Sequence, residues 1–144
     1  MDLFNSKAAI QKLKELEVEN RAAASPSMPV RYIIPTKYTD KTANGLTKCI
    51  IDWLRLCNWQ AERINNTGRQ LHNKWIKGAG TNGTADISAT VKGRSVKIEV
   101  KIGADRQSEA QKAYQSSIEK SGGVYLIAKD FSSFMQWYSK FVDA

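Results

Sequence analysis

Histidine and cysteine are scarce in this sequence of 144 residues, with His72, Cys49 and Cys57 as the full set. A zinc finger needs four such ligands close together, so that class of site is excluded. Both cysteines fall within one expected helix, roughly 12 Å apart along its axis, which is too far for a disulfide. His72 is expected to lie on the surface or to make an ordinary hydrogen bond.

Long apolar runs are also missing. No run approaches the roughly 18 residues that a membrane span requires, and residues 1–14 lack the apolar block of a secretory signal. We therefore expect a soluble, cytoplasmic protein with no membrane partner. A hydrophobic content of 42% and a charged content of 25% are ordinary for a chain with one core.

Acidic residues are outnumbered, with 14 Asp and Glu against 22 Lys and Arg, which leaves a net charge of +8. This balance favours a polyanionic partner such as DNA, because each phosphate contact by a basic side chain releases condensed counterions. Charge alone does not separate such a protein from a basic protein that binds nothing specific.

The first 40 residues differ in pattern from the rest of the chain. Residues 6–24 have helical spacing, with Ser6 as a candidate cap and a narrow apolar stripe that suits an appended helix or a partner contact. Residues 24–38 hold all three prolines and predict an extended arm, with 30–34 as a candidate edge strand. We divide the chain into this N-terminal helix and arm, residues 1–40, and a compact domain, residues 41–144.

Periodicity within the compact domain predicts the element order α-β-β-β-α-β-α. The helices are expected at 42–57, 108–121 and 131–142, and the strands at 59–65, 84–91, 95–101 and 124–128. Residues 65–68 are typical of a turn, 70–77 show no clear pattern, and the glycine-rich stretch 78–83 predicts a loop. The short apolar run 124–128 suits a central strand buried on both faces. This order predicts an α/β fold with a mixed β-sheet flanked by helices.

The two strands at 84–91 and 95–101 form the most informative segment, since both alternate strictly between apolar and polar residues. Lys92-Gly93 between them suits a tight hairpin turn. In that register Asp86 lies opposite Glu99, with Cβ atoms about 4.5–5.5 Å apart, and Lys101 follows on the same face.

Opposed carboxylates repel each other, so Asp86 and Glu99 need something to offset the repulsion, either a shared proton or a divalent cation. Magnesium binds one or two carboxylates together with waters and substrate phosphate oxygens, and a nearby lysine stabilises charge on a phosphoryl group. The alternative is a solvated strand face on which Lys97 and Lys101 neutralise the acids. The apolar opposite face, and the loop and polar helix that adjoin the strands, favour a site for phosphate-ester hydrolysis.

These residues also resemble a known family. Gly83-Thr84-Ala85-Asp86, then twelve residues, then Glu99-Val100-Lys101 is similar to the PD-(D/E)XK nuclease signature. Ser108-Glu109-Ala110-Gln111, with Tyr114 and Gly122-Gly123-Val124-Tyr125 downstream, resembles the VRR-NUC branch, which includes small phage and bacterial proteins related to Holliday-junction resolvases. The resemblance covers roughly residues 42–134 and implies a restriction-endonuclease-like core.

The resemblance also implies roles for individual residues. Asp86, Glu99 and the Val100 carbonyl would bind Mg²⁺ or Mn²⁺, Lys101 would act on the attacking water or the phosphate, and Gln111 would support the site. The implied function is a metal-dependent endonuclease that hydrolyses DNA phosphodiester bonds. Whether it selects a structure such as a junction, a flap or a nick, or cuts duplex ends, stays open.

The sequence departs from the family in its first core helix, where residues 42–47 hold no acid and only Asn44. The number of metal ions therefore stays open. Ala85 also replaces the proline usually found before the aspartate. One alternative is a catalytically weak or inactive nuclease-fold module that binds DNA or RNA. Another is an interaction subunit that uses the N-terminal helix, and a homodimer would suit a two-fold symmetric junction.

Basic and polar side chains on both sides of the presumed site are candidate contacts to nucleic acid. They are Arg63, Asn65, Arg69, Lys74, Lys77, Arg94, Lys97, Arg106 and Lys112. The aromatic residues Trp53, Trp59, Trp137 and Phe141 are expected in the core rather than as platforms for stacking bases.

Overall fold

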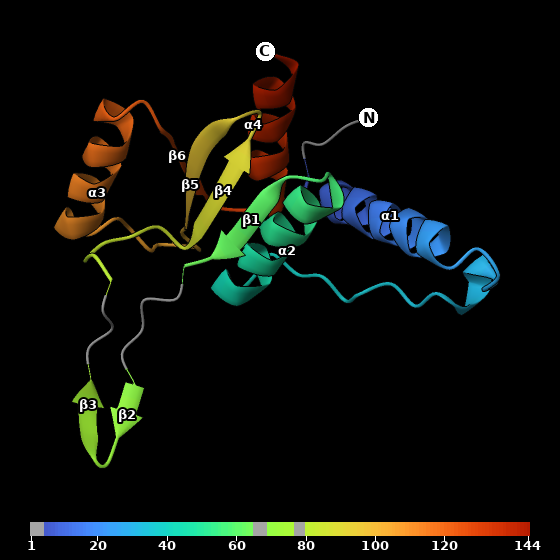
Figure 1. Ribbon diagram of the computed structural model, residues 1–144, viewed down its shortest axis with the longest axis horizontal. Helices are drawn as coiled ribbons and strands as arrows, with labels where there is room; N and C mark the ends of the chain where they lie inside the picture. The colour runs from blue at the N-terminus through green and yellow to red at the C-terminus, as the bar shows by residue number, and fades with distance from the viewer. Residues whose placement is uncertain (1–4, 65–68, 77–79) are drawn as a thin grey trace.

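The computed structural model describes residues 5–64, 69–76 and 80–144. Its centre is a four-stranded sheet, with helices α2 (Ala43–Leu56) and α4 (Phe131–Asp143) on one face and α3 (Glu109–Lys120) on the other (Figure 1). The expected α/β class and the mixed sheet flanked by helices are confirmed at this level.

The sheet has the strand order β1 (Gln60–Arg63), β4 (Ile87–Val91), β5 (Arg94–Val100), β6 (Val124–Ala128). β1, β4 and β5 pair in antiparallel fashion, whereas β6 joins β5 in parallel through α3. The expectation that residues 124–128 form a central strand buried on both faces is wrong. β6 is an edge strand, and of its residues only Ala128 is fully buried.

The β4–β5 hairpin has the expected register, with Val91 opposite Arg94 and Ile87 opposite Ile98. Lys92 and Gly93 form its turn with φ of 52° and 73°, the positive values that a two-residue hairpin turn of matching twist requires. β4 begins at Ile87, three residues later than the alternation predicts. Asp86 therefore lies one residue outside the regular ladder.

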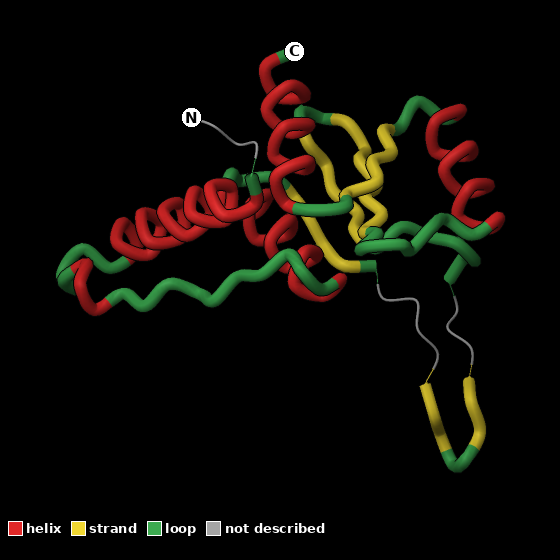
Figure 2. Tube along the Cα trace, turned by 180° about the vertical axis from the view of Figure 1, so that it is seen from behind, coloured by secondary structure: helices red, strands yellow, loops and turns green. Residues whose placement is uncertain are grey.

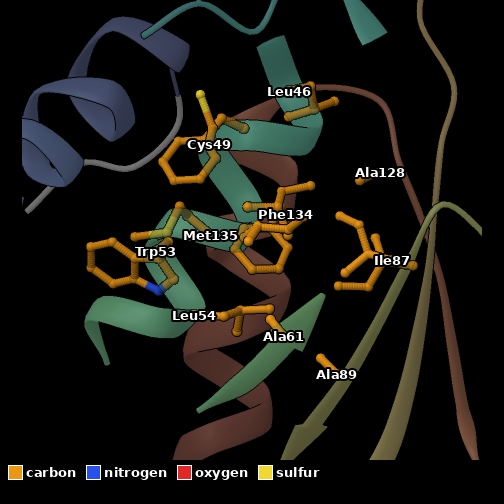
Figure 3. Close-up of a cluster of buried hydrophobic side chains, with 14 of the residues drawn as sticks. Leu46, Cys49, Trp53, Leu54, Ala61, Ile87, Ala89, Ala128, Phe134 and Met135 are labelled. Atoms are coloured by element: carbon orange, nitrogen blue, oxygen red, sulfur yellow. The ribbon is translucent and has the colours of Figure 1, made fainter. Parts of the chain in front are cut away.

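The core lies between the sheet and helices α2 and α4 (Figure 3). Thr42 caps α2 by accepting a hydrogen bond from the Gly45 amide, and Asp130 caps α4 in the same way. The aromatic residues expected in the core are there: Trp53 is buried, and Trp59, Trp137 and Phe141 pack against the buried cluster. Both cysteines are free thiols.

Helix α1 comprises Ser6–Ala24. Its N-terminal cap is Asn5 rather than the expected Ser6, and the Asn5 side chain accepts a hydrogen bond from the Ala8 amide at 2.8 Å. Ala9 and Leu13 are fully buried in the main core. The first half of α1 is thus a core element rather than a loosely appended helix. Its second half projects from the domain together with the arm (Figure 1).

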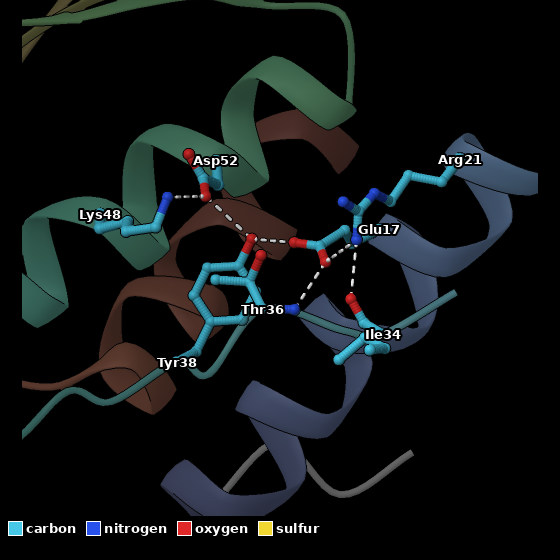
Figure 4. A network of polar contacts seen from close by, with 7 residues as sticks. All are labelled: Glu17, Arg21, Ile34, Thr36, Tyr38, Lys48 and Asp52. Carbon is cyan, nitrogen blue, oxygen red and sulfur yellow. Dashed lines mark hydrogen bonds and ion pairs between the residues drawn. The ribbon is translucent and has the colours of Figure 1, made fainter. Parts of the chain in front are cut away.

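The arm returns along α1 and holds a short 3₁₀ helix, η1 (Val30–Tyr32), in place of the expected edge strand. The prediction failed because the described strands lie elsewhere and offer this segment no ladder to join. A polar cluster around Glu17 fixes the arm to α1 and α2 (Figure 4). We call it the Glu17 network, and its members are Glu17, Arg21, Ile34, Thr36, Tyr38, Lys48 and Asp52.

Residues 69–76, which carry no clear sequence pattern, form a second hairpin of β2 (Arg69–Leu71) and β3 (Lys74–Ile76). Its turn residues His72 and Asn73 have φ of 48° and 61°. Figure 2 shows this hairpin standing away from the main sheet. His72 is exposed, as expected. The expected turn at 65–68 and the first part of the 78–83 loop lie outside the described residues. Within the described chain no helix has the length and apolar character needed to cross a membrane.

Candidate active site

Strand β5 positions the central acid of the candidate site. Val96, Ile98 and Val100 face the core, so Glu99 faces the opposite side of the sheet, with Lys101 following on the same side. Helix α3 covers this side over β6 (Figure 1). As a result only 3% of Glu99 and 7% of Lys101 remain exposed.

The two carboxylate oxygens of Glu99 have unequal surroundings. Oε1 accepts a hydrogen bond from Gln111 Nε2 at 2.9 Å and lies 3.5 Å from Lys101 Nζ. Oε2 is buried and has no hydrogen-bond partner among the described residues. An unpaired buried acceptor costs about 1–3 kcal/mol, and more when it is charged. A cation or a proton bound at Oε2 would therefore remove the free-energy cost of this unpaired oxygen.

Asp86 lies beside Glu99 and adds to this penalty. Its Oδ2 accepts a hydrogen bond from the Val100 amide at 2.8 Å, which holds the carboxylate at the end of the hairpin. The pKa of Glu99 is raised to about 7: burial is the largest cause, the charge of Asp86 adds to it, and Lys101 acts in the opposite direction. The expected closeness of the two acids is thus present, although Asp86 lies outside the ladder.

Gln111 links the start of α3 to the acids. Ser108 caps the helix, accepting from the Gln111 amide at 3.2 Å, while the Ser108 amide donates to Gln111 Oε1 at 2.9 Å. This leaves the Nε2 group of Gln111 for Glu99. The capping box therefore orients the side-chain amide that supports the site.

Gly83 explains how the loop before Asp86 approaches α3. Its φ is +76°, and a Cβ built on it would lie 2.4 Å from the carbonyl carbon and oxygen of Ala110. Only a residue without a side chain fits so close to another backbone. The glycine noted in the sequence signature thus has a packing role next to Gln111.

A cavity of about 380 Å³ opens beside Lys101 at the carboxyl ends of β5 and β6. Its lining is mainly basic and polar, and comprises Lys101, Asp105, Arg106, Gln107, Lys112, Ile127 and Lys129. Lys101 Nζ lies 3.5 Å from Asp105 Oδ2 as well as from Glu99 Oε1. The buried Glu99 therefore connects, through Lys101, to a hollow with four basic side chains and one acid in its lining.

Lys129 and Gln107 were not among the candidate residues. Val100 pairs with Ala128 across the parallel strands, so Lys101 and Lys129 follow the two strands at the same edge of the sheet. Residues that follow neighbouring parallel strands meet at one edge, and this rule could have identified Lys129. Gln107 Nε2 donates to the Tyr125 hydroxyl at 3.3 Å, and no sequence pattern indicates that contact.

The structure brings some of the candidate nucleic-acid contacts to the site. Arg106 and Lys112 line the cavity. Lys97 lies on the same sheet face and donates to Ser88 Oγ at 2.6 Å. Arg63 pairs with Ile87 at the end of β1 nearest Asp86, and its Nη2 donates to Asn44 Oδ1 at 2.7 Å.

Other candidates lie elsewhere. Arg94 is at the far end of β5, about 17 Å from Glu99 at 3.3 Å per residue, and its guanidinium lies over the Phe141 ring. Arg69 and Lys74 belong to the separate β2–β3 hairpin. Asn65 and Lys77 lie outside the described residues.

The donor set for a metal ion is small. Across residues 5–64, 69–76 and 80–144, no group of three or more His, Cys, Asp or Glu side chains could hold a metal. Asp86 and Glu99, with the Val100 carbonyl, are a set of the kind that Mg²⁺ or Mn²⁺ accepts when waters and phosphate oxygens complete its shell. The unpaired Glu99 Oε2 fits that requirement.

Comparison with protein-family models, with curated proteins and with solved structures finds no match for this chain. The relationship to PD-(D/E)XK and VRR-NUC nucleases therefore stays a prediction that rests on the sequence signature.

Proposed function

We propose that this protein is an endonuclease that hydrolyses DNA phosphodiester bonds with the help of Mg²⁺ or Mn²⁺. The observation that carries the proposal is the buried Glu99 carboxylate, which has one oxygen without a partner and stands beside Asp86. Most buried polar side-chain atoms have a hydrogen-bond partner, so an unpaired carboxylate oxygen on a residue with 3% exposure needs an explanation. A divalent cation held there would supply Lewis-acid stabilisation of the charge on the phosphate.

The side chains have distinct parts in the reaction. A water oxygen forms a bond to phosphorus while one P–O ester bond breaks. The water loses a proton and the leaving oxygen gains one, giving a phosphomonoester and an alcohol. Lys101 stabilises the negative charge that builds on the phosphate oxygens, and Gln111 holds Glu99 in position.

The cavity beside Lys101 supports a nucleic-acid substrate. Arg106, Lys112 and Lys129 surround it, and all three are exposed to solvent. Exposed basic side chains of this kind contact backbone phosphates without reading sequence. The net charge of +8 attracts the same polyanion over longer distances.

The first experiment is cleavage of linear, nicked, flapped and four-way-junction DNA, and of matched RNA, with Mg²⁺, with Mn²⁺ and with EDTA. Wild type is compared with Glu99→Gln and Lys101→Ala, and with the exposed controls Glu119→Gln and Lys120→Ala. We expect metal-dependent cleavage that both site variants lose and both controls keep. Cleavage that survives in EDTA or in Glu99→Gln would refute the proposal.

Metal binding has a readout besides activity. A bound cation stabilises the folded state by RT ln(1 + [L]/Kd). Mg²⁺ should therefore raise the thermal unfolding midpoint of wild type, with little effect on Glu99→Gln and a full effect on Glu119→Gln. An equal shift in all three proteins would place the cation elsewhere.

A second candidate function is a nucleic-acid-binding module without catalysis. Among the described residues, Asp86 and Glu99 are the two acids that could bind a metal, and no third one joins them. The first core helix has Asn44 in place of the acid that the resemblance leads one to expect, and Asn44 accepts a hydrogen bond from Arg63. Wild type that binds DNA in a salt-sensitive way but never cuts it would favour this module over the enzyme.

A further inference from the structure

The β2–β3 hairpin carries an exposed tryptophan that the candidate active site does not use. In the hairpin register Trp75 pairs with Gln70 on one face, while Leu71 pairs with Lys74 on the other. Trp75 is 71% exposed. Figures 1 and 2 both show the hairpin extending away from the sheet and its helices.

This exposure is unusual for the residue type. Tryptophan has the largest apolar surface of any side chain, and a hairpin of two three-residue strands has no core in which to bury it. The other three tryptophans of the chain are buried or half-buried around α2, β1 and α4. An indole left exposed on a strand that stands away from the core indicates a contact with another molecule.

The charge of residues 64–85 indicates which kind of partner the hairpin would bind. Residues 64–85 contain Arg69, Lys74 and Lys77 but no Asp or Glu. A polyanion suits this surface, whereas two copies of the hairpin placed together would bring like charges into contact. The charge therefore favours nucleic acid over a second copy of the chain.

We propose that the β2–β3 hairpin binds nucleic acid that has unpaired bases, and that Trp75 stacks on one of them. The positive charge of the segment that carries Trp75 attracts the phosphate backbone of that nucleic acid. This inference rests on the proposed function and adds a preference for forks, flaps, junctions or single strands. Bases inside a duplex are already stacked, and exposing one costs a few kcal/mol.

The test measures binding without cleavage. Full-length Glu99→Gln serves as the background, in EDTA, with three probes: labelled oligothymidylate, a forked duplex, and a blunt duplex of the same length. Trp75→Ala should weaken binding to the first two about tenfold, the size of one lost base–aromatic stack, and change blunt-duplex binding less than about twofold. Trp75→Phe should keep most of the affinity because phenylalanine also stacks. Tyr32→Ala removes another exposed aromatic residue, 62% exposed on the arm, and should have no effect.

Intrinsic fluorescence gives an independent readout. Oligothymidylate should quench the emission of the exposed indole in the Glu99→Gln background, and the quenching should disappear in Trp75→Phe even though binding persists. Quenching that remains in Trp75→Phe would place the stacked base on another tryptophan and overturn the inference.

The remaining outcomes separate the two proposals. If wild type cuts DNA but Trp75→Ala binds every probe normally, the hairpin inference fails and the nuclease stands. If no protein cuts DNA but the Trp75 dependence holds, the enzyme fails and the hairpin contact stands. A change from dimer to monomer on Trp75→Ala, measured by sedimentation, would make the hairpin a self-association surface and overturn the inference.

Discussion

Two buried glutamates, Glu17 and Glu99, have opposite surroundings within one small protein. Glu17 Oε1 accepts from the Thr36 amide at 2.8 Å, and Glu17 Oε2 lies 2.5 Å from the Tyr38 hydroxyl (Figure 4). Glu99 has one paired oxygen and one without a partner among the described residues. Burial acts to raise the pKa of both carboxyls.

The neighbouring groups decide the net result. At Glu17 the hydrogen bonds from Tyr38 and Thr36, with Arg21, outweigh burial, and the pKa falls below its ordinary value. At Glu99 the charge of Asp86 adds to burial and the pKa rises to about 7. A carboxylate that holds elements together is surrounded by hydrogen-bond donors. A carboxylate that serves a ligand has an oxygen without a donor when the ligand is absent. This contrast, which does not depend on sequence signatures, is the basis on which we propose a structural role for Glu17 and a functional role for Glu99.

The largest expected effect comes from replacing the unsatisfied acid. Glu99→Gln should lower cleavage roughly 100-fold or more, yet raise the free energy of unfolding by roughly 1–3 kcal/mol above pH 7 in EDTA. The amide removes the repulsion with Asp86 and can donate to it. Cleavage assays and urea unfolding on the same protein preparation measure both quantities. A variant that is both inactive and less stable than wild type would show that Glu99 is a structural acid like Glu17.

The features predicted from the sequence are those determined locally. The Lys92-Gly93 turn and strict alternation predicted the register that brings Asp86 and Glu99 together. The resemblance put Gln111 beside the acids, and in the structure the capping box that Gln111 forms with Ser108 holds its side-chain amide next to Glu99. Each of these features depends on residues close together in the chain.

Features that depend on distant partners were missed. The apolar run at β6 suited a central strand, but sheet order is set by the crossover through α3, which periodicity does not show. Residues 30–34 have strand propensity but no neighbouring strand, so they form η1. The β2–β3 hairpin has strands of three residues and an unusual His72-Asn73 turn, and such short strands give no alternation to detect.

The next test of the contrast between Glu99 and Glu17 changes Gly83, where the loop before Asp86 approaches α3. Gly83→Ala would put a Cβ 2.4 Å from the Ala110 backbone at a positive φ. It should lower the free energy of unfolding by roughly 2 kcal/mol or more and cleavage about tenfold, because α3 and Gln111 must move away from Glu99. Gly122→Ala is the matched control: its φ is +85°, but nothing lies within 4 Å of its Cβ. Equal losses in both variants would mean that backbone strain, and not the approach to α3, sets the effect.

Replacing the satisfied acid should have the reverse pattern. Glu17→Gln should lower the free energy of unfolding by roughly 2 kcal/mol, because hydrogen bonds to a charged acceptor weaken, and leave cleavage within about twofold of wild type. Chemical denaturation and the cleavage assay measure the two effects. The exposed Glu19→Gln on the same helix controls for loss of charge. A large loss of cleavage in Glu17→Gln alone would connect the arm to catalysis and remove the contrast.

The pH dependence of stability has a different sign for the two acids. The raised pKa of Glu99 means that the folded protein binds a proton more tightly than the unfolded chain. Its contribution to stability is therefore full below about pH 4.5 and is lost as pH rises to about 7, with a limit of 1.36 kcal/mol per pH unit. The lowered pKa of Glu17 gives stability that is present above about pH 4.5 and is lost as pH falls through the folded-state value.

The two variants should therefore respond to pH in different ranges. In EDTA, the stability gained by Glu99→Gln should grow between pH 5 and about 7. The stability lost by Glu17→Gln should shrink as pH drops below about 4.5. Unfolding curves for the two variants that stay parallel to wild type across this range would show that neither carboxyl titrates differently in the folded protein.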